Sequence, residues 1–397
     1  MTRSNTRIAA VTAALLLSCF QIVDNAAQAA TAPSNSNPSQ AAPGPLPLTV
    51  KPEIVPVLTA QPENIKTKAP QLIQSVPSTP EMVPEASGAG LTIERSVESF
   101  SELTLKGSKL QAEEPLLGSR GDTLNFVREL WQVSWRSNDP IDLWVILPRG
   151  VKNPPVVLYL YGYPTETNRF KNDAYCKRIV AGGAAAVGFV SALTGQRTEY
   201  RPPKDTLISK MPEALASTVH DVQMVLNFLE ARGDLDMSRV GIFGQGSGGA
   251  IAILTASVEP RIKVLDLLDP WADWPEWFSG APIVRPEDRA EYLKPDFQKP
   301  LELLEPLHFL LQLKSQKIRM QFDADVGEPK NAIDKLVAAA PASTHIVCFP
   351  SSRDMYNANS GGRLFAWMAK QLDAHPATIE QPASTAPAPA AAAKSNP

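Results

Sequence analysis

The sequence predicts an α/β protein with a mostly parallel, eight-stranded sheet covered by helices. From about residue 95 onward, short apolar runs alternate with stretches that have helical spacing of apolar residues. Two of the runs, Pro155–Tyr161 and Ala184–Ser191, are apolar almost throughout. Such runs are typical of strands buried on both faces of a parallel sheet. Strands that alternate with helices favour βαβ units, which build a sheet of this kind.

The expected elements begin with a hairpin and continue as strand–helix units. Asn125–Trp135 and Ile141–Leu147 are two strand patterns separated by a polar turn that contains proline. Pro212–Arg232 has apolar residues at helical spacing and predicts a long helix. The remaining elements are expected in this order: the strand Arg239–Phe243, the helix Gly248–Val258, the strands Val264–Leu268, Ile318–Phe322 and Thr344–Phe349, and the helix Arg363–Leu372.

Composition separates one globular domain from two tails. The chain has 397 residues and 37 prolines, which crowd residues 33–84 and recur from 376 to 397. Between these stretches, residues 95–375 are enough for one α/β domain with its own core. A net charge of −3 with scattered basic residues argues against a nucleic-acid partner. Three cysteines exclude a disulfide scaffold, and their spacing suggests no metal site; we expect no cofactor.

The first 29 residues are predicted to be a signal peptide. Arg3 and Arg7 precede the apolar stretch Ile8–Phe20, and Ala27-Gln28-Ala29 offers a cleavage site. Cys19 ends a sequence that resembles a lipobox, so lipidation there is the alternative, and only that alternative predicts membrane attachment. Residues 30–94 and 376–397 are expected to be a disordered linker and tail, rich in proline and alanine. Cleavage of a signal peptide and lipidation at Cys19 both predict an exported protein, periplasmic or secreted.

The most informative stretch is a glycine-rich turn, Gly244-Gln245-Gly246-Ser247-Gly248-Gly249, between a predicted strand and a predicted helix. It resembles the G-x-S-x-G turn of the α/β-hydrolase superfamily, particularly its dienelactone-hydrolase, acetyl-esterase and oligopeptidase-like branches. In that superfamily the nucleophilic serine lies on a strained strand-to-helix turn. The resemblance covers residues 120–375 and implies an α/β-hydrolase fold with serine esterase or peptidase chemistry.

Two further loops occur in the order that this superfamily shows. Tyr159–Pro164 looks like the oxyanion loop, which implies a binding role for Gly162 and Tyr163 beside Gln245 and Gly246. Gln321–Asp325 lies where the superfamily carries its catalytic acid, so the resemblance points to Asp325. The stretch Phe349–Asp354 lies where the last strand delivers the histidine.

The nucleophile position departs from the superfamily pattern. The simplest register places Gly246 at the serine position and Ser247 one residue later. The other register makes Ser247 the nucleophile but puts Gln245 where a small residue is needed. We favour the register with Gly246.

The base position departs as well. The chain has four histidines, His220, His308, His345 and His375, and none follows the last strand, where Arg353 and Asp354 stand instead. Asp354 is a poor base for a serine proton unless burial raises its pKa from about 4. We expect no histidine near the Ser247 hydroxyl. We also expect the amides of Ser247 and Tyr163 to face the oxyanion hole while the Ser247 side chain points aside.

Two function classes follow. The favoured one is an exported α/β-hydrolase-fold protein that is catalytically impaired and binds a partner or a small-molecule, acyl or glycan-like ligand in the old cleft. The alternative is an active secreted ester or peptide hydrolase that uses Ser247, Asp325 and Asp354. A remote alternative is dinucleotide binding, because Gly244, Gly246 and Gly249 also fit G-x-G-x-x-G and aspartates follow about twenty residues later, at Asp266 and Asp269.

Some neighbouring features have two interpretations. Trp271 and Trp274 form either an aromatic floor for a ligand or the anchor of a small helical cap inserted at 271–316. Arg353, or Arg197 in the loop that also holds Arg201, is expected to compensate Asp325 and Asp354. Whether Cys176 and Cys348 form a disulfide is left open.

Overall fold

The computed structural model describes residues 98–137, 139–163, 167–193, 210–313 and 316–377. The predicted signal peptide, Cys19, the linker, most of the tail and the loop with Arg197 and Arg201 lie outside these residues. Among the described helices, none combines the length and the apolar character needed to cross a membrane.

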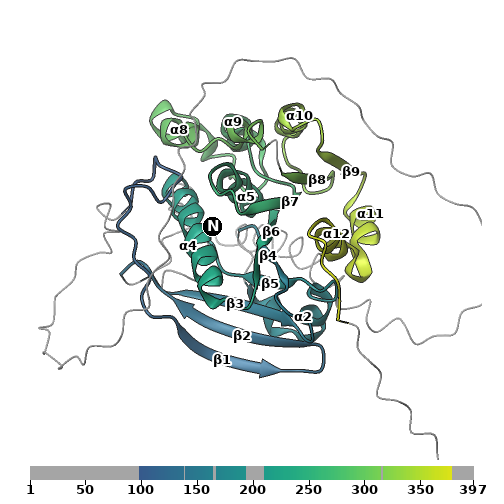
Figure 1. The fold of residues 1–397 in the computed structure, drawn as a ribbon. Coiled ribbons are helices and arrows are strands. Elements are labelled where there is room, and N and C mark those ends of the chain that lie inside the picture. Colours follow the sequence, from purple (N-terminus) through teal and green to yellow (C-terminus); the bar gives the residue numbers. More distant parts are fainter. Residues whose placement is uncertain (1–97, 138, 164–166, 194–209, 314–315, 378–397) are drawn as a thin grey trace, which may run out of the picture.

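Nine strands of the described residues form one sheet, in the order β1-β2-β3-β5-β4-β6-β7-β8-β9 (Figure 1). The pairs β1–β2, β2–β3 and β3–β5 are antiparallel, and every other neighbouring pair is parallel. All eight predicted strands are present, which confirms the predicted sheet. The strands are β1 (Leu116–Asp122), β2 (Phe126–Val133), β3 (Ile141–Pro148), β4 (Pro155–Leu160), β5 (Ala185–Gly188), β6 (Asp236–Gln245), β7 (Ile262–Leu268), β8 (Lys317–Asp323) and β9 (His345–Phe349).

The additional strand, β1, was not predicted. Its sequence, LLGSRGD, lacks alternating apolar residues, and six of its seven residues are exposed. Antiparallel hydrogen bonds to β2 hold it at the edge of the sheet, as Figure 1 shows. Pairing with a neighbouring strand, rather than its own sequence pattern, therefore makes this segment a strand.

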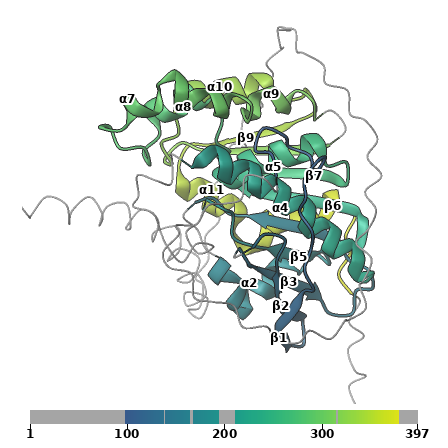
Figure 2. The same cartoon turned by 90° about the vertical axis from the view of Figure 1, so that its left-hand side faces the viewer.

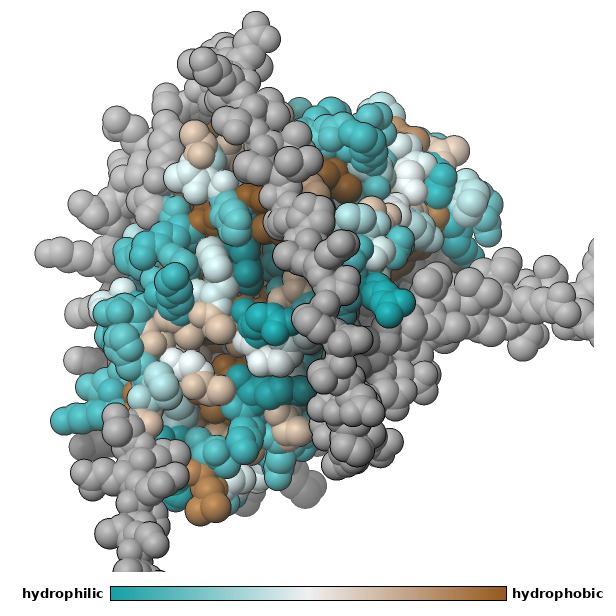
Figure 3. All heavy atoms as spheres, turned by 90° about the vertical axis from the view of Figure 1, so that its right-hand side faces the viewer, coloured by the Kyte–Doolittle hydropathy of each residue, from teal (hydrophilic) through white to brown (hydrophobic). Residues whose placement is uncertain are grey.

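Helices cover both faces of the sheet and enclose two separate cores (Figures 1 and 2). The larger core lies under α4 (Met211–Arg232) and α5 (Ser247–Val258), and the other under α2 (Asp173–Ile179) and α12 (Arg363–Gln371). Two further helices are α10 (Lys330–Ala339), which contacts α9, and α11 (Ser352–Asn359), which contacts α12. On the side of the molecule shown in Figure 3, the described hydrophobic residues occur in small groups among hydrophilic ones.

The insertion after β7 contains four short helices: α6 (Trp274–Gly280), α7 (Arg289–Tyr292), α8 (Pro295–Glu302) and α9 (Pro306–Leu310). The helix α9 packs on α5, and α8 contacts α4. The aromatic rings of Phe278, Tyr292 and Phe297 contact one another and join α6, α7 and α8. The insertion therefore extends the layer of helices on the α4–α5 face of the sheet.

A buried polar network fastens the start of the described chain to α4. The guanidinium of Arg136 donates to Glu98 at 2.6 Å and to Asp221 at 2.5 Å. The His220 ring lies between the Glu98 carboxylate, at 2.6 Å, and the carbonyl oxygen of Glu102, at 2.7 Å. Burial opposes the charge on Glu98, but His220 and Arg136 outweigh it and lower the pKa of this carboxyl.

Candidate functional site

The turn from β6 into α5 has the backbone of a nucleophile turn, with glycine at its strained position. Gly246 has φ of 54° and ψ of −119°, a conformation that glycine adopts far more readily than other residues. The glycines around it are required for close packing. A Cβ on Gly248 would lie 2.0 Å from the Leu160 carbonyl oxygen, and one on Gly244 would lie 2.5 Å from the Gly248 oxygen. The strained position of the turn is thus held by Gly246, and Ser247 follows it as the first residue of α5.

Ser247 is the first residue of α5 and is fully buried. Its hydroxyl oxygen accepts a hydrogen bond of 2.9 Å from the backbone amide of Tyr163. The expectation that this side chain points aside into the helix start was therefore wrong. The hydroxyl turns toward the loop after β4, where the partly buried Tyr163 amide needs an acceptor. One of the two amides expected to form the oxyanion hole is occupied by the protein itself.

None of the four histidines, all of which lie in the described part of the chain, hydrogen-bonds to Ser247 or Asp325. His220, on α4, is engaged by the Glu98 carboxylate and the Glu102 carbonyl oxygen. His308, His345 and His375 are exposed. In the described residues, the hydrogen bond of the Ser247 hydroxyl is made with a backbone amide and not with an imidazole.

The Trp271 indole lies against the turn at Gly246. An ideal Cβ at Gly246 would lie 3.2 Å from Nε1 of Trp271 and 3.8 Å from the Cα of Gly162. The Trp271 amide donates to the Gly246 carbonyl oxygen at 3.1 Å, so ring and backbone both lie against the turn. The ring is 7% exposed and lies 4.4 Å, centroid to centroid, from Trp277. A side chain at position 246 would therefore require this indole to shift by a few tenths of an ångström.

The segment that carries Trp271 is fastened at both of its ends. Asp269 and Asp273 both have positive φ, 45° and 56°. The Asp269 carboxylate accepts from the Asp323 amide at 2.8 Å, and Asp273 pairs with Lys335 at 2.5 Å. These bonds restrain the backbone on either side of Trp271 and so favour a single position of its indole.

Glu305, in the insertion, holds the other side of this segment. Its carboxylate accepts from the amides of Asp273 and Trp274, at 2.8 and 2.9 Å. Trp274 is buried, and its indole N–H donates to the Leu304 carbonyl oxygen at 3.1 Å. Of the two interpretations of these tryptophans, the geometry of Trp274 favours an anchor for the insertion.

The loops that would carry the acid and the base bind each other instead. Asp325 accepts from the backbone amide of Ser352, the first residue of α11, at 2.8 Å. Asp354 accepts from the Ser351 hydroxyl at 2.7 Å. Of the two arginines expected to compensate these carboxylates, Arg353 forms no ion pair with either of them within the described residues, and Arg197 lies outside those residues. Asp325 therefore caps the start of α11 at the place where a histidine would otherwise be oriented.

Two buried carboxyl groups beside Trp271 have raised pKa values. Burial raises the pKa of Asp269 to about 8; the Asp323 amide opposes the rise, and the negative charges of Asp323 and Glu328 add to it. Burial likewise raises the pKa of Glu328 to about 7, against the opposing effect of the Trp277 and Trp271 indoles. Glu328 was not predicted from the sequence, because it belongs to no recognisable motif and comes close to Trp271 and Trp277 only in the folded chain.

These raised values predict that the protein becomes less stable as pH rises. Below the unfolded-state pKa values of 3.8 and 4.5, both groups are protonated in both states. Above them the folded protein binds more protons than the unfolded chain, so stability falls until pH passes about 8. We expect the free energy of unfolding to drop by roughly 2 kcal/mol or more between pH 5 and pH 8.

Urea unfolding at both pH values measures this effect, and Asp269→Asn is the informative variant. Asparagine tolerates the positive φ and keeps an oxygen for the Asp323 amide. The variant should lose the share of the pH dependence that Asp269 contributes and keep the share from Glu328, whereas the exposed control Asp122→Asn should keep both. Equal slopes in all three proteins would contradict the assignment.

Asp266, one of the two aspartates considered for dinucleotide binding, is fully buried and accepts two hydrogen bonds from Arg319, at 2.8 and 2.6 Å. It is therefore not placed to bind a ribose.

The two cysteines that could have formed a disulfide, Cys176 and Cys348, are both free thiols. In the described part of the chain, no group of three histidine, cysteine or acidic side chains is arranged to hold a metal ion.

The sheet order, the antiparallel pairs β2–β3 and β3–β5, and the strained turn at Gly246 define the class of protein: the chain has the α/β-hydrolase fold. No protein-family model and no curated protein matches the chain.

Solved structures of esterases are similar to the chain in fold. An acetyl xylan esterase from Paenibacillus sp. R4 is 17% identical with a TM-score of 0.49, and the match covers 66% of this chain and 90% of that one. An acetyl xylan esterase from Thermoanaerobacterium sp. JW/SL YS485 is 13% identical with a TM-score of 0.46, covering 66% and 89%. An S-formylglutathione hydrolase from Agrobacterium tumefaciens is 14% identical with a TM-score of 0.44, covering 64% and 99%.

Proposed function

We propose that this protein is an exported α/β-hydrolase-fold protein that lacks hydrolase chemistry and binds a ligand or partner at the carboxyl edge of its sheet. One observation carries the proposal: the strained position of the turn is Gly246, which has no side chain, and an ideal Cβ there would lie 3.2 Å from Nε1 of the Trp271 indole.

Three features at this edge speak against serine hydrolase chemistry. Acyl transfer needs a nucleophile, a base within hydrogen-bond reach and free donors for the oxyanion. Gly246 has no side chain, and the Ser247 hydroxyl is buried against the Tyr163 amide. Among the described residues, no histidine reaches that hydroxyl, so the alternative of an active hydrolase through Ser247 has no base.

Binding is supported by the strain and the buried charge that the edge retains. Backbone strain and perturbed carboxyl groups concentrate at functional sites. Here Gly246, Asp269 and Asp273 have positive φ, and Asp269 and Glu328 have raised pKa values. The ligand class that suits the proposal is a small molecule with an acyl or glycan-like group, or a partner protein.

Turnover of short acyl esters tests the absence of hydrolase chemistry. We expect the purified protein and its Ser247→Ala variant to hydrolyse p-nitrophenyl acetate at the same slow rate. A rate that falls by about tenfold or more in the variant would show a working serine and refute the proposal. The export part has its own test: mass spectrometry of the mature N-terminus should find chains that begin at residue 30 or carry lipid on Cys19.

A further inference from the structure

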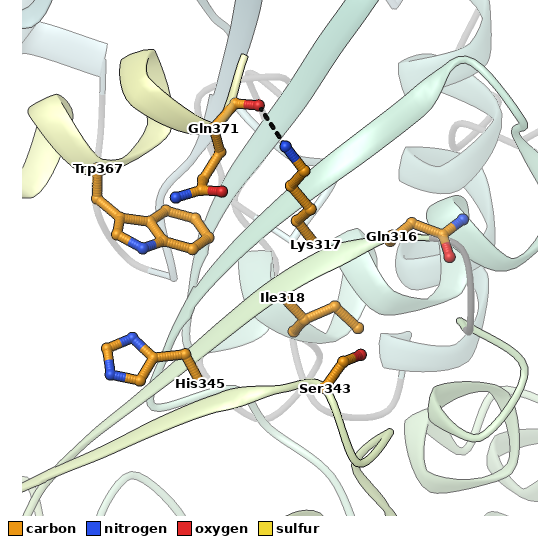
Figure 4. Close-up of a pocket in the computed structure, with 7 residues that line it drawn as sticks. All are labelled: Gln316, Lys317, Ile318, Ser343, His345, Trp367 and Gln371. Carbon is orange, nitrogen blue, oxygen red and sulfur yellow. Dashed lines mark hydrogen bonds between the residues drawn. The ribbon is translucent and has the colours of Figure 1, made fainter. Parts of the chain in front are cut away.

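A second candidate site lies at the opposite edge of the sheet. A cavity of about 480 Å³ opens at the amino-terminal ends of β8 and β9, beside α12 (Figure 4). Because β6 to β9 are parallel, these ends lie on the edge away from Gly246, which follows the carboxyl end of β6. The volume is within the range of small-ligand sites. The residues that line the cavity are Gln316, Lys317, Ile318, Ser343, His345, Trp367 and Gln371.

Trp367 gives this cavity an aromatic wall that is supported from outside. The guanidinium carbon of Arg319 lies 4.5 Å from the centre of the indole ring, although Arg319 does not line the cavity. Two hydrogen bonds to Asp266 fix that guanidinium, and a third reaches the Leu364 carbonyl oxygen at 3.2 Å. A cation held against an indole restrains the ring. The wall is therefore positioned before any ligand arrives.

The polar groups of the cavity favour an anion. No aspartate or glutamate is among the lining residues, whereas Lys317 and His345 are. The Lys317 ammonium donates to the Gln371 carbonyl oxygen at 3.2 Å, which uses one of its three N–H donors. Figure 4 shows Trp367 and His345 on one side of the cavity and Lys317 on the other. Asp266, a buried carboxylate near His345, is paired with Arg319.

We propose that this cavity binds a small carboxylate carried on a ring. The ring stacks on the Trp367 indole, and the carboxylate accepts hydrogen bonds from the Lys317 ammonium on the other side of the cavity. The Ser343 hydroxyl and the Gln371 side-chain amide can bond the other polar groups of the ring. Two kinds of molecule share this chemistry, a uronic acid and an arenecarboxylic acid. The site is independent of the turn at Gly246, so it stands whether or not the old cleft binds anything.

Isothermal titration of the full chain tests this proposal with matched probes. D-Glucuronate and benzoate are the two ring carboxylates, D-glucose and benzyl alcohol are their neutral counterparts, and acetate is an anion without a ring. We expect at least one ring carboxylate to bind about tenfold more tightly than its neutral counterpart and than acetate. Which ring carboxylate binds decides between the two kinds of ligand.

Three variants assign the binding to this cavity. Trp367→Ala and Lys317→Gln should each weaken binding about tenfold, and Lys263→Gln, on β7 at the same edge, should leave it unchanged. Trp367→Phe keeps an aromatic wall and should retain binding, which separates lost stacking from misfolding; thermal unfolding confirms that each variant is folded. Failure of both ring carboxylates to bind, or binding that survives Lys317→Gln and Trp367→Ala, would overturn the proposal.

Discussion

Replacing Trp271 with alanine is expected to lower the free energy of unfolding by about 3–5 kcal/mol, the range for a buried tryptophan. The indole is almost fully buried, packs against Trp277 and fills the space in front of Gly246. The fastened ends of its segment, at Asp269 and Asp273, prevent the neighbours from collapsing into the void. The variant should therefore retain most of the cavity, which is the main source of the cost.

Chemical denaturation measures this loss, and added indole identifies its origin. A cavity of indole shape should bind free indole, so the midpoint of unfolding of Trp271→Ala should rise with indole concentration. Trp271→Phe, which fills part of the space, should lose much less stability than Trp271→Ala. A loss below about 1 kcal/mol, with no response to indole, would show that Trp271 does not fill a buried site.

Gly248→Ala is expected to cost about 3 kcal/mol or more, or to prevent folding. The new methyl group would lie 2.0 Å from the Leu160 carbonyl oxygen and 2.6 Å from the carbonyl carbon of that residue. Both atoms belong to the backbone of β4, next to β6 in the centre of the sheet. Relief of the clash requires either the strand or the helix start to move, and the packing of α5 on the sheet opposes that movement.

The matched control for this variant is Gly121→Ala in β1. Nothing lies within 4 Å of the methyl group there, and the φ of Gly121 is not positive. Its stability should change by less than about 0.5 kcal/mol. Urea midpoints of the two variants give the comparison, and similar small effects for both would mean that the turn is looser than described.

The inner strands of the sheet were predictable because strands buried on both faces are hydrophobic along their length. Pro155–Leu160, for example, is hydrophobic and buried at every position, since it packs against helices on both faces. The edge strand β1 carries no such mark, because exposed residues leave a strand free to have almost any composition. The helices α7 and α9, of four and five residues, are likewise too short to show a helical period.

The site was predictable only where it depends on local backbone. The glycines from Gly244 to Gly249 specify the turn, and the register with Gly246 at the strained position follows from them. The placement of Trp271 over Gly246, and of Glu328 beside Trp271, depends on contacts between three different loops. The predicted direction of the Ser247 side chain was wrong for the same reason, because its hydroxyl bonds to an amide that is 84 residues away in the chain.

Covalent labelling with a fluorophosphonate probe, followed by mass spectrometry of the labelled peptides, tests the central claim most directly. The probe reacts with serines that a base activates. We predict no label on Ser247, and the same background for the unchanged protein and Ser247→Ala. A label on Ser247 that disappears in Ser247→Ala would contradict the account, because it would show a working nucleophile behind Trp271.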